Sequence, residues 1–155
     1  QDAGDSARSD RVQGFQGCAI RIALGKVVDH YDFPICCLAL ATPTGMVIKG
    51  NYGIDARFVE HPANGKSILF HGVTRKLPVI ISDAAKDERY ANDVLVAGPP
   101  YVRFFIGVPI MLCSATCIGT LCIMDTEPKT YFSVNDCQFA MQVADEIVRH
   151  VVDSG

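Results

Sequence analysis

The spacing of apolar residues indicates a helix near each end of the chain. From about residue 10 to residue 30, apolar side chains recur every three or four positions, and the same spacing returns from Cys137 to Val151. This spacing is typical of an amphipathic helix. Ser133, with Asp136 three residues later, provides a capping signal for the second helix.

Between these helices, short apolar runs bounded by turn residues predict strands. Two such runs flank a Thr-Pro-Thr-Gly turn and predict a hairpin over residues 34–53. A short helix is predicted to end at Pro78 and a single buried strand to follow it. The remaining strands are predicted at 103–112 and 117–125, as a second hairpin.

Residues 84–100 show neither the apolar spacing of a helix nor that of a strand, and they carry acidic residues, glycine and proline. A connection of this length inside a compact domain usually serves a function. The order is therefore helix, hairpin, helix, strand, long loop, hairpin, helix. Mostly antiparallel pairs with helices at both ends predict an α+β fold.

Composition limits the class of protein. The chain has 155 residues, of which 49% are hydrophobic and 20% charged, as expected for one folded domain. We expect a flexible N-terminal segment at 1–10 and a single domain at 11–152. The net charge of −3, without a Lys/Arg cluster, argues against nucleic acid as a partner. No apolar run reaches the roughly 18 residues of a membrane span, so we expect no membrane association.

The seven cysteines lie mostly inside apolar segments. An odd number in such positions is typical of reduced thiols in a cytoplasmic protein. Cys113 and Cys117 form the nearest approach to a metal motif, but they lack a second pair and a nearby histidine. We therefore expect no metal site.

Four motifs follow one another between residues 78 and 128. They are Asp-x-Arg-aromatic at Asp87–Tyr90, Val-x-Gly-Pro at Val96–Pro99, Arg-Phe-aromatic-x-Gly-x-Pro at Arg103–Pro109 and Gly-Thr-Leu-Cys-hydrophobic-x-Asp at Gly119–Asp125. In this series the chain resembles the GAF family of small-molecule-binding sensory domains, particularly the branch common in bacterial sensor proteins.

The resemblance implies a GAF-like antiparallel sheet of about five or six strands. The terminal helices would cover one face, and the short helix and the long loop would enclose a pocket on the other. Relatives bind cyclic nucleotides, haem, tetrapyrroles or small metabolites, and their terminal helices often mediate a homodimer. One departure is clear: a cysteine of the branch's Ser-Phe-Cys-x-His pattern is replaced by Leu69 here.

Alternation along residues 103–112 suggests which side chains face that pocket. Phe104 and every second residue to Leu112 form an apolar set for the terminal helices, whereas Arg103, Phe105 and Gly107 face the other way. Gly107 would leave room beside the backbone. Arg103 and Phe105 are thus candidates for a pocket wall. Alternatively, Arg103 pairs with Asp83, Asp87 or Asp125 and pins the long loop.

The same two interpretations apply to other polar residues. Arg89 could bind a phosphate or carboxylate, or it could belong to a loop network with its acidic neighbours. Tyr90 is expected to anchor the loop in the core. His71, in the short helix, is either a hydrogen-bonded structural group or a ligand contact.

Cys122 shares one face of its strand with Thr120 and Met124, and Gly119 of the same strand is predicted to allow close backbone approach. In the favoured function, a sensory domain binds a small molecule and signals through its helices, and Cys122 is a small buried hydrophobe. In the second, Cys122 is a redox thiol that acts with Cys113 or Cys117 and has His71 as a possible neighbour, as in an enzyme or sensor of the free methionine sulfoxide reductase type. The third is a structural dimerisation domain without a pocket. We favour a binding module over an enzyme.

Overall fold

The computed structural model describes residues 19–43, 45–53, 61–62, 68–69, 77–113 and 116–153. Residues 19–31 are helical and are called the N-terminal helix below. The strands are β1 (Ile35–Thr42), β2 (Gly45–Tyr52), β3 (His61–Pro62), β4 (Val79–Ile81), β5 (Phe104–Cys113) and β6 (Thr116–Asp125). The other helical elements are η2 (Ala84–Lys86), α3 (Val94–Ala97), η3 (Val134–Cys137) and α4 (Gln138–Asp153).

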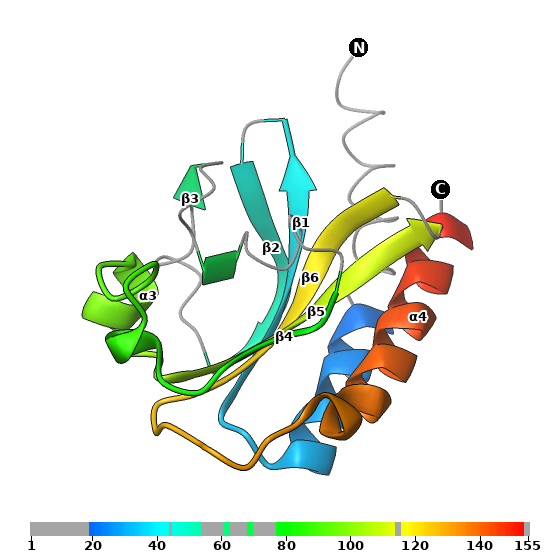
Figure 1. The fold of residues 1–155 in the computed structure, drawn as a ribbon. Coiled ribbons are helices and arrows are strands. Elements are labelled where there is room, and N and C mark those ends of the chain that lie inside the picture. The colour runs from blue at the N-terminus through cyan, green and yellow to red at the C-terminus, as the bar shows by residue number, and fades with distance from the viewer. Residues whose placement is uncertain are drawn as a thin grey trace.

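The strands form one antiparallel sheet in the order β3-β2-β1-β6-β5-β4. Pairing of β1 with β6 joins the two predicted hairpins and places these strands at the centre of the sheet. The N-terminal helix and α4 lie against one face, whereas α3 and the long connection lie on the other (Figure 1). The predicted α+β class and the placement of the terminal helices are therefore confirmed.

The structure adds elements that the sequence pattern did not predict. The two-residue strand β3 pairs with the far edge of β2, and the long connection contains the single turns η2 and α3. Of the short helix predicted before Pro78, only residues 68–69 are described, and they are helical. The predicted N-terminal segment at residues 1–10 lies outside the described residues.

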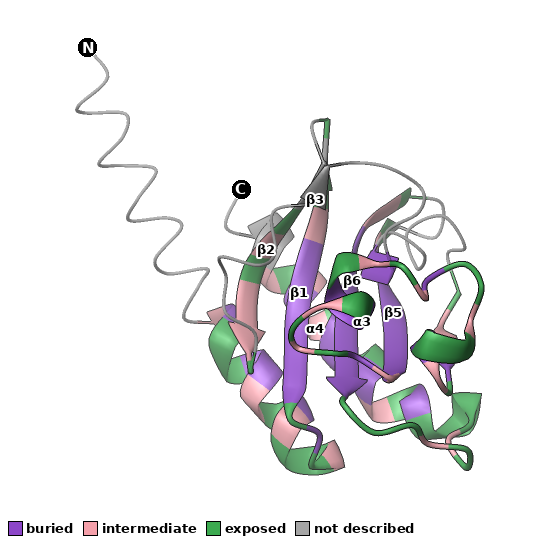
Figure 2. Ribbon diagram, turned by 90° about the vertical axis from the view of Figure 1, so that its left-hand side faces the viewer, coloured by how far each residue is buried: buried purple, intermediate pink, exposed green. Residues whose placement is uncertain are grey.

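The sheet separates two apolar cores, and strands β1, β6 and β5 are buried along most of their length (Figure 2). We call the core under the terminal helices the helix-side core. It includes Leu24, Val27, Cys36, Leu38, Phe104, Ile106, Val108, Ile110, Leu121, Ile123, Ala140 and Ile147. The core on the opposite face is called the loop-side core. Its buried members are Ile35, Cys37, Ala39, Ile68, Leu69, Ile81, Ala84, Tyr90, Leu95, Val96, Val102, Phe105, Cys122 and Met124.

The predicted alternation holds along most of β5. Phe104 through Ile110 alternate as expected between the two cores. The prediction is wrong for Leu112, which is 47% exposed. Register shifts between Ile110 and Met111 and between Met111 and Cys113 interrupt the pairing with β6, and such irregularities redirect side chains.

Gly119 marks the closest approach between the central strands. A Cβ atom there would overlap the carbonyl oxygen of Ala39 and lie 2.7 Å from Cδ2 of Leu40. The predicted role of Gly119 in close backbone approach is confirmed. None of the helices in the described ranges combines the length and apolar character that a bilayer span requires.

Candidate functional site

The loop-side face is the candidate site, and Asp93 holds together two of the segments that cover it. One oxygen of its carboxylate, Oδ1, accepts the Leu95 N–H at 2.9 Å and so caps α3. The other oxygen, Oδ2, accepts the Ile68 N–H at 2.9 Å. Asp93 therefore joins the helical residues 68–69 to the long connection. The sequence reasoning missed this role, although an aspartate directly before Val-Leu-Val is a recognisable helix cap.

Arg103 fastens the same connection to the start of β5. Its Nη1 donates to the carbonyl oxygens of Val96 and Val102, each at 2.9 Å. Among the described residues its guanidinium contacts no carboxylate. The predicted pairing with Asp83, Asp87 or Asp125 is therefore wrong. The predicted effect is nevertheless present, because the carbonyl groups at the end of α3 are satisfactory acceptors for a cation.

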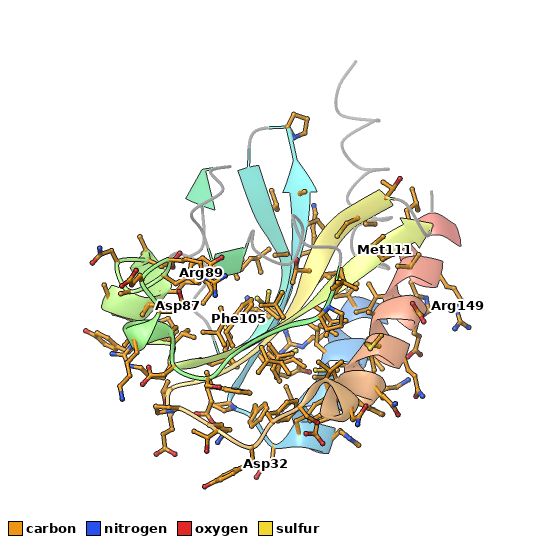
Figure 3. The ribbon with its side chains drawn as sticks, viewed as in Figure 1. Asp32, Asp87, Arg89, Phe105, Met111 and Arg149 are labelled. Carbon is orange, nitrogen blue, oxygen red and sulfur yellow. The ribbon has the colours of Figure 1, made fainter. Side chains whose placement is uncertain are left out.

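Arg89 and Asp87 form an ion pair within the connection, beside α3 and far from Arg149 on α4 (Figure 3). Arg89 Nε donates to Oδ1 of Asp87 at 3.0 Å and Nη2 to Oδ2 at 2.7 Å. These hydrogen bonds raise the pKa of Arg89. The loop-network interpretation of Arg89 is the one that this geometry supports.

Tyr90 follows directly and is 2% exposed within the loop-side core. Its ring also lies 5.2 Å from the Arg89 guanidinium carbon. The prediction that Tyr90 anchors the loop is confirmed.

The other two aspartates of the predicted network serve local backbone groups. Asp83 accepts the Ala85 N–H at 3.1 Å and caps η2. Asp125 accepts the Glu127 N–H at 3.2 Å and pairs with Lys129 Nζ at 3.1 Å. The two ends of the covering segment are held by backbone hydrogen bonds, since the Ala84 N–H donates to the Arg103 carbonyl oxygen and the Arg103 N–H donates to the Asp125 carbonyl oxygen.

Phe105 lies in the loop-side core as predicted, but it changes the interpretation of Gly107. A Cβ atom on Gly107 would lie 2.9 Å from Cε1 of Phe105 and 3.2 Å from Cγ2 of Thr120. The space beside Gly107 is thus taken by the Phe105 ring. The expectation that Gly107 leaves room for a ligand is wrong at this position.

Cys122 faces the loop-side core and is paired with a second thiol that the sequence reasoning did not connect to it. Cys37 lies directly opposite in β1, and both residues are 0% exposed. Burial, followed by the hydrogen bond to Cys37, raises the pKa of Cys122 well above the usual range. Because the thiolate is the reactive species, this environment disfavours the redox interpretation of Cys122.

Thr120, two residues before Cys122, is fully buried, and its Oγ1 has no hydrogen-bond partner among the residues that the structure describes. Local packing among these residues does not explain this polar group. His71, the remaining predicted site residue, lies outside the described residues. Within the described ranges, no group of three His, Cys, Asp or Glu side chains could hold a metal ion.

These features define an α+β domain whose sheet carries its helices on one face and a pinned, mainly irregular cover on the other. The GAF domain sequence profile matches residues 16–151. The chain therefore belongs to the GAF domain family, as its four motifs suggested.

Comparison with known proteins gives both sequence and structural relatives. A cyclic di-GMP phosphodiesterase from Pseudomonas aeruginosa is 24% identical over 106 residues, which are 68% of this chain and 18% of that protein. The chain thus matches less than a fifth of the length of this relative.

Two solved structures show the same fold. The GAF domain of an Acinetobacter phosphoenolpyruvate-protein phosphotransferase has a TM-score of 0.73 and 17% identity, covering 90% of this chain and 83% of that one. The type II free methionine-R-sulfoxide reductase from Thermoplasma acidophilum has a TM-score of 0.74 and 16% identity, covering 92% and 96%. At these identities the likeness concerns the fold alone.

Proposed function

We propose that this GAF domain is a sensory or regulatory module that binds a small molecule on its loop-side face. The observation that carries the proposal is the division of the sheet into two cores, one of which is covered mainly by short elements. Such a cover can open without disturbing the terminal helices, because segments with little regular structure open at a lower free-energy cost.

The start of β5 offers a route for the signal. Arg103 contacts the end of α3, Phe105 lies in the loop-side core and Phe104 lies in the helix-side core. A ligand that moves the cover would therefore act on three consecutive residues. We propose that the terminal helices receive the signal in a homodimer.

A ligand screen by native mass spectrometry tests the binding proposal. Cyclic nucleotides, haem, bilins and small metabolites are the ligand classes to include, with thermal shift as a second measurement, since a ligand of the folded state raises Tm. A hit should lose its effect in Ala39→Leu, which fills the buried floor of the loop-side face, and keep it in Ala41→Leu, on the exposed end of the same strand.

If Ala39→Leu does not fold, ligand-induced hydrogen-exchange protection replaces it as the readout. Protection over residues 84–103 is the expected result. Protection confined to the terminal helices, or no hit from any class, would contradict the proposal.

The homodimer is tested by sedimentation velocity. Ile22 on the N-terminal helix is 60% exposed and Met141 on α4 is 40% exposed, so a dimer formed through these helices would bury both side chains. Ile22→Glu with Met141→Glu should weaken the dimer, whereas Leu77→Glu, also on an exposed residue but outside both helices, should not. A wild-type chain that sediments as a monomer at all concentrations would refute this part.

A further inference from the structure

The centre of the loop-side face is built from small side chains contributed by three neighbouring strands. Cys37 and Ala39 of β1 lie opposite Cys122 and Thr120 of β6, and Cys122 lies opposite Gly107 of β5. The next row of paired residues, toward the start of β5, has larger side chains. It consists of Ile35, Met124 and Phe105. We call Cys37, Ala39, Thr120 and Cys122 the small-residue floor.

Thr120 is the polar group of this floor. It is 0% exposed, and within the described part of the chain its Oγ1 has no hydrogen-bond partner. Its methyl carbon is directed toward Gly107, so the side chain stands on the loop-side face. A buried hydroxyl without a partner costs free energy that a valine of the same shape would avoid. Packing therefore does not explain why the residue is threonine.

We propose that the small-residue floor binds an uncharged, largely apolar small molecule that hydrogen-bonds to Thr120 Oγ1. This inference rests on the proposed function, of which it specifies the ligand class. The hydroxyl can donate one hydrogen bond and accept others. The thiols of Cys37 and Cys122 and the methyl group of Ala39 supply polarisable, apolar contact around it.

The charge distribution favours a neutral ligand. Among the described residues, the only buried charged side chain is that of Asp125, which is 9% exposed and pairs with Lys129. Of the described arginines on this side, Arg103 binds two carbonyl oxygens and Arg89 binds Asp87. A buried charge without a partner is strongly unfavourable, so a phosphate-bearing ligand does not fit this floor.

Titration of phenol, indole and toluene into three proteins tests the inference. The proteins are wild type, Thr120→Val, which keeps the shape and removes the hydroxyl, and Thr120→Ser, which keeps the hydroxyl. Binding is measured from the amide NMR shifts of Ala39 and Cys122. We expect phenol and indole to bind wild type and Thr120→Ser, and to bind Thr120→Val about three- to tenfold more weakly, the loss expected for one hydrogen bond. Toluene, which has no hydrogen-bonding group, should bind wild type and Thr120→Val equally.

The free protein provides an independent readout. Thr120→Val should raise the urea midpoint, because it removes a buried hydroxyl that has no partner. A lower midpoint, equal phenol binding by Thr120→Val and wild type, or no saturable binding of phenol and indole to wild type would each overturn the inference. If a cyclic nucleotide binds and these neutral probes do not, this inference fails while the proposed function stands. If no ligand of any class binds, both fail.

Discussion

Gly119 and Gly25 both lie in regular secondary structure, but the space beside their Cα atoms differs. We predict that Gly119→Ala lowers the free energy of unfolding by about 2 kcal/mol or more, because the new Cβ would overlap the Ala39 carbonyl oxygen between the central strands. Gly25→Ala should raise it by about 0.5–1 kcal/mol, since glycine is unfavourable inside a helix. Its Cβ would lie 3.3 Å from the Tyr52 hydroxyl oxygen and 3.9 Å from Cζ of the same ring, a contact that a small shift of this side chain relieves.

Urea unfolding of the two variants measures both effects. The pair is matched, because the same methyl group is added to a buried strand and to a helix. A stabilised Gly119→Ala protein would contradict the observed approach of β1 and β6.

Buried thiols make stability depend on alkaline pH. Burial raises the pKa of Cys36, Cys122 and Cys137, the last from 9.0 to about 11. As pH rises above the pKa of the unfolded thiols, the unfolded state loses protons that the folded state retains, so stability falls. The expected loss approaches about 1.4 kcal/mol per pH unit for each such thiol. Below that pKa the contribution is constant.

Urea midpoints between pH 7.5 and 10 measure this slope. Cys137→Ala should reduce the slope, because it removes one of the thiols whose pKa is raised by burial. Equal slopes for Cys137→Ala and wild type would argue against the buried environment of Cys137.

At the scale of elements, Tyr31 joins the two terminal helices. Its hydroxyl donates to the Asp136 carbonyl at 2.6 Å and accepts the Ala140 N–H at 3.1 Å, so it satisfies a donor in the first turn of α4. We predict that Tyr31→Phe lowers stability by about 1–2 kcal/mol, because the ring contacts remain but the Ala140 N–H loses its partner.

Urea unfolding and the exchange rate of the Ala140 amide measure this effect. Tyr131→Phe is the matched control, since Tyr131 is 93% exposed and should show no change. Unaltered Ala140 exchange in Tyr31→Phe would refute the capping role.

At the scale of the whole molecule, the two cores should differ in how readily they open. We predict that amides of the cover, including those of Leu95 and Val102, exchange through a local opening that costs less free energy than global unfolding. The central pairs of β1 with β6 should exchange only on global unfolding. The physical reason is that the cover is built of short elements, whereas β1 and β6 are paired on both sides.

Native-state hydrogen exchange measures the two free energies. Asp93→Ala should lower the free energy of opening of the cover, because the Ile68 and Leu95 amides lose their acceptor. Asp83→Ala, which removes a cap from η2 alone, should affect it less. A cover that opens only together with the central strands would contradict the division into two units.

Local patterns in the sequence determined most of the architecture. Period-two alternation assigned Phe104 and Phe105 to their correct faces and grouped Cys122 with Met124, because a strand turns each successive side chain to the opposite side. Which face of the sheet Cys122 occupies was left open by the sequence. Helical spacing identified the N-terminal helix and α4. The ordered motifs identified the GAF family, and Gly119 was recognised as a point of close approach.

Only the tertiary structure decided which groups meet. Arg103 binds the Val96 carbonyl oxygen of α3 instead of an aspartate, Asp93 reaches Ile68, and Cys37 lies beside Cys122. The last two contacts join segments that are distant in sequence, so only the folded chain brings these groups together. The hydroxyl of Thr120, which has no hydrogen-bond partner among the described residues, is the clearest case, since a missing hydrogen bond at a buried site can be recognised only from the folded neighbours.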